Sequence, residues 1–274
     1  DQVTAVAVPE STNPEDVSTT VKAFMAADLP HELIKLLEPI VLQPSAFSDN
    51  RSLKNLLMLT AIRTDKAKVT GYIERLSGYD VDEIAKIAID HGLFEEAFQI
   101  YSKAGQNTDA MDVLVEHIVS IDRAQHFANK LNLPEIWSRL GKAQLDGLRV
   151  KDAMDSYVRA EDPSNFEEVI EIAERAGREE ELIRYLQMAR KLTREPKIDT
   201  EYAYCLAKAH RLSDMEEFLS MTNVADVLHV GEKCFNDGLY EASRLLFSSV
   251  SNYARLATTL VYLNDFPGAI EAAR

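Results

Sequence analysis

The segment His31-Glu32-Leu33-Ile34-Lys35 comes nearest in this chain to a zinc-protease motif. Such a motif needs a histidine at both ends of H-E-x-x-H, because two imidazoles one helical turn apart bind the same metal ion. Lys35 stands where the second histidine should be. The segment therefore predicts an ordinary helix and no metalloprotease site.

Cysteine and histidine also occur together further along the chain, as Cys205 with His210 and His229 with Cys234. Each pair is five residues apart, and five steps along a helix turn the two side chains about 140° away from a shared face. Structural zinc sites usually carry closer pairs, such as CxxC or HxxxH. We interpret the two cysteines as reduced, buried, small apolar residues of a cytosolic protein, and the histidines as ordinary.

Three further features could carry chemistry, but each has a simpler explanation. His117 and His126 lie near Glu116 and could sense pH, yet no acid is paired with them at helical spacing, so surface positions are expected. Trp137 follows a helix start at proline, which favours a core anchor over a binding platform. The run Arg178-Glu179-Glu180-Glu181 is typical of a solvated first helical turn.

No GxxxxGK[ST], GxGxxG or GxSxG segment occurs, and the glycines are scattered singly. The sequence therefore predicts no catalytic residue, no cofactor site and no metal site. We expect a protein that is not an enzyme and that needs no cofactor.

The composition limits the possible partners. The formal charge of −15 argues against nucleic acid or anionic lipid, both of which need a basic face. No stretch reaches the ~20 apolar residues of a membrane span, so direct membrane insertion is not expected. With 46% hydrophobic residues and only 10 glycines and 9 prolines, the chain can bury a helical core.

The elements that position these residues form a repeat. A helix-hairpin pattern, in which a small or apolar residue is flanked by apolar residues three before and four after it, returns about every 28 residues. The spacings between successive central residues are 27, 29, 29, 33, 27 and 27. The central residues are Ala97, Ala124, Ala153, Leu182, Met215, Ala242 and Ala269.

A small central residue allows the two helix backbones of a hairpin to approach closely, while its apolar neighbours cover the crossing. The pattern resembles tetratricopeptide units but is shorter than their 34 residues. It predicts an all-α fold, an α-solenoid of stacked antiparallel helix hairpins with about 18 helices.

Proline, asparagine and aspartate mark the predicted helix starts. Asn13-Pro14, Leu29-Pro30, Leu133-Pro134 and Asp162-Pro163 each predict one, and Asp80 is expected to cap another. Left-handed C-caps are expected at the glycines between periodic segments, which are Gly92, Gly105, Gly147, Gly177 and Gly238.

Long stretches of the chain resemble clathrin heavy chains. They include NPEDVSTTVKAFMAADLPHELIKLLEPIVL at 13–42, NLLMLTAIRTDKAKVTGYIERLSGYD at 55–80 and WSRLGKAQLDGLRVKDAMDSYVRAEDPSNF at 137–166. YLQMARK at 185–191 and HVGEKCFNDGLYEASRLLF at 229–247 add to the likeness, which covers nearly the whole chain.

The resemblance implies a segment of the heavy-chain leg, from the end of the distal leg into the proximal leg. It implies a non-enzymatic scaffold of the clathrin coat on vesicles and coated pits, in the cytoplasm, that supports endocytosis and vesicle traffic. The implied partners are neighbouring heavy-chain legs and, along the C-terminal part from about Asp214, the beginning of the track for the clathrin light chain. The full-length parent would be a homotrimer joined at a distant hub.

We expect residues 1–12 to be a linker or frayed end, and residues 13–274 to form one continuous solenoid segment, truncated at both ends. A tetratricopeptide-type adaptor that binds peptides in a concave groove is the alternative. Such grooves usually carry repeated polar clamps on the inner helices, whereas here alanine, leucine and aromatic residues recur.

Overall fold

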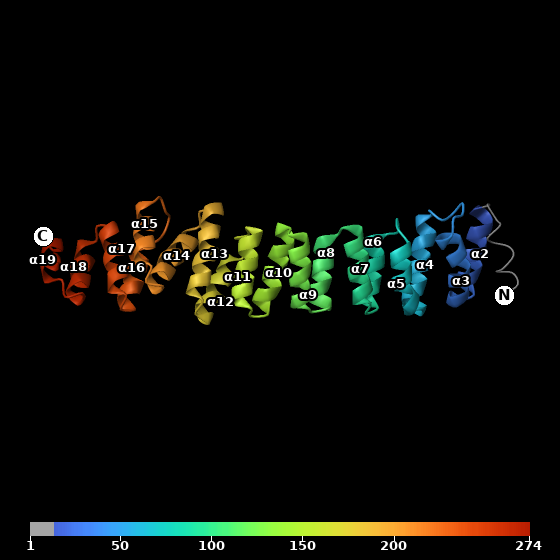
Figure 1. Ribbon diagram of the computed structural model, residues 1–274, viewed down its shortest axis with the longest axis horizontal. Helices are drawn as coiled ribbons and strands as arrows, with labels where there is room; N and C mark the ends of the chain where they lie inside the picture. Colours follow the sequence, from blue (N-terminus) through green and yellow to red (C-terminus); the bar gives the residue numbers. More distant parts are fainter. Residues whose placement is uncertain (1–13) are drawn as a thin grey trace. The chain divides into compact units, whose positions relative to one another are not determined.

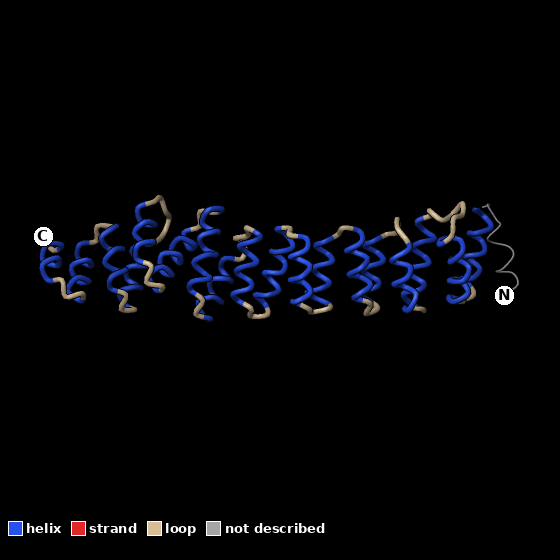
Figure 2. Tube along the Cα trace, viewed as in Figure 1, coloured by secondary structure: helices blue, strands red, loops and turns tan. Residues whose placement is uncertain are grey.

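The computed structural model describes residues 14–274. Within this range it contains eighteen α-helices and a short π-helical segment. No strand occurs among these residues, as the colouring of Figure 2 shows. The expected asparagine cap at Asn13 and the expected linker over 1–12 lie outside the described residues. The chain divides into two compact units, Asp1–Phe127 and Ala128–Arg274, and the boundary falls within one helix, α9.

The first unit is built from consecutive antiparallel helices (Figure 1). Most helices contact the next one along the chain, as α3 contacts α4 and α6 contacts α7. In addition, α4 contacts α6 and α5 contacts α7. The elements are α2 (Pro14–Ala26), α3 (Pro30–Leu42), α4 (Arg51–Thr64), α5 (Lys66–Arg75), α6 (Val81–Asp90), α7 (Phe94–Ala104), α8 (Asn107–Asp112), the π-helical segment η1 (Val113–His117) and the start of α9 (Ile121–Leu131).

The second unit repeats the same arrangement. Many helices contact the next one along the chain, as α10 contacts α11, and some contact the helix two further on, as α11 contacts α13. The elements after α9 are α10 (Pro134–Asp146), α11 (Val150–Ala160), α12 (Phe166–Ala176), α13 (Glu179–Leu192), α14 (Pro196–Lys208), α15 (Leu212–Ser220), α16 (Val227–Asn236), α17 (Tyr240–Ser249), α18 (Tyr253–Tyr262) and α19 (Phe266–Ala272). The all-α solenoid of stacked hairpins predicted from the repeat is confirmed.

Most predicted helix starts are correct. Pro14, Pro30 and Pro134 are the first residues of α2, α3 and α10, where a missing N–H costs no helical hydrogen bond. The Asp80 side chain caps α6 by accepting a hydrogen bond from the Glu83 N–H.

The predicted start at Asp162-Pro163 is wrong, because α12 begins only at Phe166. Asp162 folds its carboxylate onto the next turn instead, where it accepts hydrogen bonds from the Ser164 N–H at 2.9 Å and from the Ser138 hydroxyl. This local turn takes the side-chain oxygens that a helix cap would use.

Gly147 does not provide the predicted left-handed C-cap. Its φ is −81°, and the next residue, Leu148, adopts φ 57° in its place. The other four predicted glycines, Gly92, Gly105, Gly177 and Gly238, do have positive φ. A leucine in this conformation costs about 1–2 kcal/mol, so sequence propensity alone selected the wrong residue.

The left-handed residues give the true register of the repeat. In each hairpin such a residue lies five positions before a buried central residue, as Gly92 lies before Ala97. Gly238 therefore pairs with Ser243, which is fully buried, and the predicted central residue Ala242 is one position out of register. The corresponding pairs are Val119 with Ala124, Leu148 with Ala153, Gly177 with Leu182, His210 with Met215 and Asn264 with Ala269.

Small residues lie on both helices of a hairpin. A Cβ added to Gly141 of α10 would lie 3.2 Å from the Tyr157 ring of α11, and one added to Gly231 of α16 would lie 2.8 Å from the Phe247 ring of α17. Each ring follows its central residue by four positions, and each glycine precedes that residue by twelve. The two hairpins therefore use the same contact, an aromatic ring laid directly on glycine backbone.

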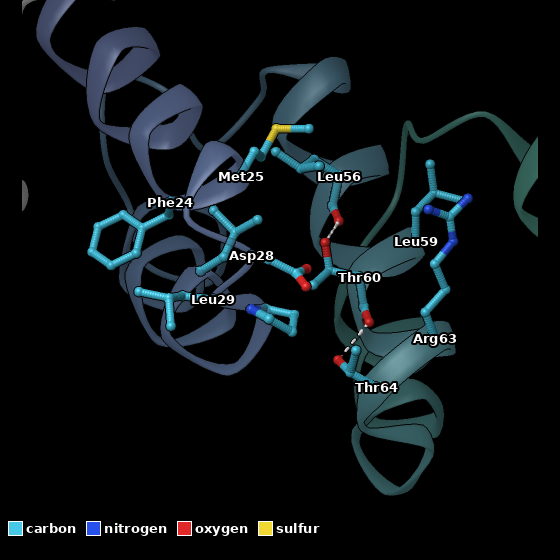
Figure 3. Close-up of a pocket in the computed structure, with 11 residues that line it drawn as sticks. Phe24, Met25, Asp28, Leu29, Leu56, Leu59, Thr60, Arg63 and Thr64 are labelled. Atoms are coloured by element: carbon cyan, nitrogen blue, oxygen red, sulfur yellow. Dashed lines mark hydrogen bonds between the residues drawn. The ribbon is translucent and has the colours of Figure 1, made fainter.

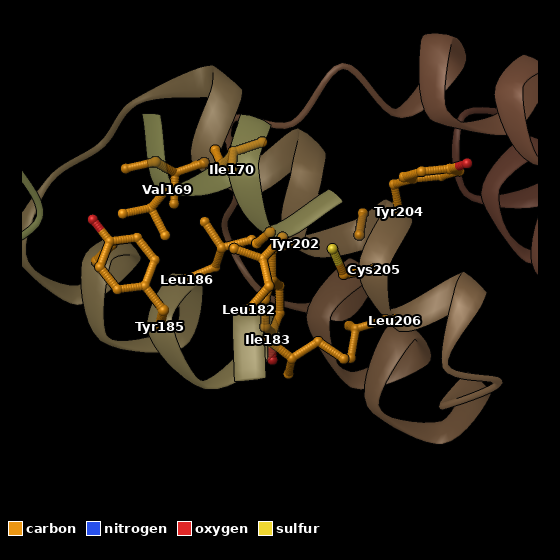
Figure 4. Close-up of a cluster of buried hydrophobic side chains, with 14 of the residues drawn as sticks. Val169, Ile170, Leu182, Ile183, Tyr185, Leu186, Tyr202, Tyr204, Cys205 and Leu206 are labelled. Carbon is orange, nitrogen blue, oxygen red and sulfur yellow. The ribbon is translucent and has the colours of Figure 1, made fainter. Parts of the chain in front are cut away.

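The core of the second unit runs without interruption from Leu145 to Leu246. Figure 4 shows part of it, with Leu182 and Leu186 of α13 gathered near Val169, Tyr185 and Tyr202. Because each hairpin buries its apolar face against its neighbours, the core is continuous along the stack and has no single centre.

Candidate functional site

The His31 segment forms part of a helix surface. His31 and Lys35 are exposed on α3, and the Lys35 Nζ lies 3.0 Å from the Glu32 carboxylate. This is an ordinary ion pair one turn apart, and it brings no second imidazole to His31.

The two cysteines are buried and free, as predicted. Burial raises the pKa of the Cys205 thiol to about 12, and burial also raises the pKa of the Cys234 thiol to about 12. Both groups are therefore protonated at neutral pH and unsuited to nucleophilic or metal chemistry. The two histidines near them in the sequence lie in different settings. His210 has a left-handed backbone conformation in a turn, and His229 lies in the first turn of α16.

Trp137 is a core anchor, as predicted. The residue is 2% exposed, its indole N–H donates to the Asn132 side chain at 3.1 Å, and the Arg159 guanidinium stacks on its ring at 4.5 Å. His117 is exposed at the end of η1 and stacks on the Phe94 ring at 5.2 Å. Each side chain is held by its own neighbours, so neither forms a binding platform.

The acidic run after Arg178 opens α13, as predicted, but it is more than a solvated turn. Glu179 forms an ion pair with Lys208 of α14, and Glu180 lies 3.5 Å from Arg211. The hydrogen bond from Lys208 lowers the pKa of Glu179. These acids therefore connect one hairpin to the next.

No three histidine, cysteine, aspartate or glutamate side chains among residues 14–274 are grouped so that they could hold a metal ion. Over the same residues, every helix is too short or too polar to cross a bilayer.

The polar network that links successive hairpins was not predicted. Its members are separated by about one repeat, and in the bonded pairs the separations range from 26 to 30 residues. The Lys68 Nζ, for example, lies 2.9 Å from the Glu38 carboxylate. The pairs are Arg51–Asp80, Lys68–Glu38 and Arg123–Glu95 in the first unit, and Lys142–Glu168, Arg184–Asp155 and Lys208–Glu179 in the second.

A sequence signal for this network does exist, because opposite charges recur one repeat apart. It is weak, since a chain with 27% charged residues contains many such coincidences. Most of the pairs are exposed, and an exposed pair contributes ~0–1 kcal/mol, so each pair adds little to the stability of the fold.

Comparison with known proteins shows the family to which this chain belongs. A family model described as a region in clathrin and VPS matches residues 8–152 and 157–274. The chain belongs to the clathrin repeat family. It is 58% identical over all 274 residues to a probable clathrin heavy chain of Schizosaccharomyces pombe, of which the match covers 16%. The corresponding identities are 51% to the clathrin heavy chain of Drosophila melanogaster, with 16% covered, and 49% to clathrin heavy chain 2 of Homo sapiens, with 17% covered. The chain thus spans about a sixth of the length of these relatives, and it is a clathrin heavy-chain repeat segment.

One contact between clathrin repeats uses backbone acceptors. Lys103 of α7 donates from its Nζ to the carbonyl oxygens of Ile73, Glu74 and Leu76 at 2.6, 2.9 and 2.9 Å. These carbonyls end helix α5, where the helix dipole attracts a cation. The lysine therefore satisfies carbonyl groups that have no partner within their own helix.

The clathrin repeats also leave grooves between hairpins. One groove has a volume of about 440 Å³. Phe24 and Met25 of α2 and Leu56 and Leu59 of α4 line it, as Figure 3 shows. Its Thr60 and Thr64 hydroxyls donate to carbonyls of their own helix, at 2.7 Å each. The groove contains no acid–base pair aligned for chemistry and is suited to packing.

Proposed function

We propose that this chain is a leg segment of a clathrin coat, and that it acts as a structural scaffold with no catalytic activity. The observation that supports the proposal most strongly is the alignment of all 274 residues with clathrin heavy chains at up to 58% identity. The stacked hairpins agree with it, because a helical stack offers surfaces for association and no central catalytic pocket.

In this proposal residues 13–274 form one continuous solenoid that packs against neighbouring heavy-chain legs in the lattice. The full-length parent is a homotrimer located on the cytosolic face of coated vesicles and coated pits, where it supports endocytosis and vesicle traffic. Weak contacts repeated over many legs give a stable lattice that remains reversible.

The alternative, a tetratricopeptide-type peptide adaptor, has less support. The central positions of the hairpins are filled by buried residues such as Ala97, Ala124 and Ala153. Repeated polar clamps would need exposed side chains there.

Negative-stain imaging of the purified full-length parent tests the scaffold proposal. Three-legged particles that assemble into closed cages are expected. Particles that stay single-legged under assembly conditions would refute it.

We further propose that the C-terminal part, from about Asp214, begins the track for a clathrin light chain. An extended helical partner needs many contacts made together, so this fragment should bind a light chain weakly or not at all, whereas a chain extended beyond Arg274 should bind well. Titration calorimetry of both chains against one light chain tests this. Equal affinities would place the decisive contacts within these 274 residues.

A further inference from the structure

A polar pocket of about 370 Å³ lies between two loops of the second unit, the one that joins α13 to α14 and the one that joins α15 to α16. It forms where the repeat is longest, in the 33-residue interval between the central residues Leu182 and Met215. The additional length extends the end of α13 and its loop, so the pocket is a departure from the common hairpin.

Positive charge gathers at this pocket in an otherwise acidic chain. The segment from Arg184 to Lys197, both included, contains five basic residues and one acidic residue, whereas the whole sequence has a net charge of −15. Arg184 lies 3.3 Å from Asp155 and Lys197 lies 3.6 Å from Glu167, so these two are already paired. The other three basic residues, Arg190, Lys191 and Arg194, line the pocket.

The floor of the pocket is fixed. The Arg190 Nε donates to Asp199 Oδ1 at 3.0 Å, and the Arg190 guanidinium stacks over the Phe218 ring at 4.6 Å. Asp199 Oδ2 accepts the Val224 N–H at 2.9 Å, which ties the second loop to the same carboxylate. Arg190 and Asp199 therefore neutralise each other, and Asp199 connects the end of α13 to the second loop. The other N–H groups of the guanidinium remain available as hydrogen-bond donors to a ligand.

The rim carries uncompensated charge. Lys191 and Arg194 are exposed, and neither side chain forms an ion pair or hydrogen bond with any residue in the range 14–274. Thr193 and Thr222 line the pocket beside them and add two hydroxyl donors. The pocket thus offers two free cations together with neutral donors.

We propose that this pocket binds a phosphorylated serine or threonine side chain of a partner protein. A phosphate monoester carries about −1.5 to −2 charges at neutral pH and three acceptor oxygens, which matches two free cations and the hydroxyls beside them. Arginine and lysine bind phosphate through strong charge-assisted hydrogen bonds. A single carboxylate would leave one of the two cations unmatched.

The charge distribution favours a peptide over a membrane. An anionic bilayer attracts a broad basic face, but this chain has a net charge of −15 and would be repelled outside the pocket. A single side chain inserted between two loops avoids that repulsion.

Fluorescence anisotropy with the purified chain tests the proposal. The probe is a labelled peptide of glycine and alanine with one central phosphoserine, compared with the same peptide carrying serine. We expect the phosphorylated peptide to bind at least about tenfold more tightly, and K191S/R194S to remove about tenfold of that affinity. The control K130S/K151S removes two exposed lysines of the same unit away from the pocket and should leave binding unchanged.

Both double variants should keep the parental circular dichroism and melting temperature, because the altered side chains are exposed. Equal binding of the phosphorylated and unphosphorylated peptides overturns the proposal. So does an inorganic phosphate affinity equal to that of the phosphopeptide, which would mean an adventitious anion site only. Co-sedimentation with phosphatidylserine vesicles that depends on Lys191 and Arg194, without phosphopeptide binding, would assign the pocket to a membrane and also overturn the proposal.

Discussion

Gly231 shows how closely the helices of one hairpin approach. Replacing it with alanine would place a Cβ 2.8 Å from the Phe247 ring, which is buried and cannot move aside freely. We expect Gly231→Ala to lower the free energy of unfolding by about 1–3 kcal/mol despite the better helix propensity of alanine. Chemical denaturation measures this.

Gly71 is the matched control, because it also lies inside a helix but has no neighbouring atom within 4 Å of an added Cβ. Gly71→Ala should stabilise the protein by up to ~1 kcal/mol. If both substitutions stabilise it equally, the contact between Gly231 and Phe247 is looser than described.

Two carboxylates of the inter-hairpin network contribute to the way in which the stability of the protein changes at acid pH. Burial raises the pKa of Glu38, but hydrogen bonds from Tyr72 and Lys68 outweigh burial and leave its pKa below the usual 4.5. The hydrogen bond from Lys208 likewise lowers the pKa of Glu179. A lowered folded-state pKa contributes stability above the unfolded value, and that stability is lost as pH falls through the folded value.

The double variant Glu38→Gln/Glu179→Gln should therefore be less stable than the parent at neutral pH and should lose less stability on acidification below about pH 4.5. Melting temperatures recorded across the acid range test this. Parallel curves for parent and variant would show that these two carboxylates do not contribute.

At the scale of the helix, Ala153 tests the crossing within one hairpin. The residue is fully buried at the contact between α10 and α11. Ala153→Trp should separate the two helices and destabilise the protein by at least ~1–3 kcal/mol. The control Lys151→Trp places the same side chain at an exposed position of α11 and should change stability by less than ~0.5 kcal/mol. An unchanged melting temperature for Ala153→Trp would contradict the hairpin register.

Lys103 tests the link between hairpins. Lys103→Met keeps most of the aliphatic stem but leaves the end of α5 without its cation, so we expect a loss of about 1 kcal/mol. Lys86→Met, at an exposed position on α6, should have no effect. Thermal unfolding of both variants measures whether the three contacts between Lys103 and the carbonyl oxygens contribute to stability.

The elements could be predicted from the sequence because their determinants are local. Pro30 and Asp80 mark helix starts through one or two backbone groups, and the alternation of small and large residues repeats within each hairpin. Predictions failed where a neighbouring residue competed, as at Pro163, where Asp162 forms a turn with Ser164, and at Gly147, where Leu148 takes the left-handed conformation.

The candidate site was less predictable. Trp137 and the buried cysteines followed from pattern and composition, but the pocket beside Arg190 did not. The pocket forms because a loop about 30 residues further along the chain lies against the end of α13. A local sequence pattern does not indicate which loops lie side by side in the fold.

At the scale of the whole molecule, we expect a helical monomer whose stability does not depend on metal. Circular dichroism should show helix without substantial sheet, and sedimentation should give a single chain. Chelator should leave the melting temperature unchanged, because no set of side chains among residues 14–274 could hold an ion. Stoichiometric zinc after purification, or a stable trimer, would contradict these expectations.

The contacts made by Lys103 also bear on how such a chain can evolve. Its acceptors are backbone carbonyls, which every amino acid supplies, so substitutions at the residues that carry them leave the bond intact. Lys54 and Lys66 are bonded in the same way, to the carbonyl oxygens of Ser77 and His91. A pair such as Arg123 with Glu95, by contrast, survives a charge reversal only if both positions change together. Where a lysine meets backbone, one repeat can accumulate mutations without any compensating change in its neighbour.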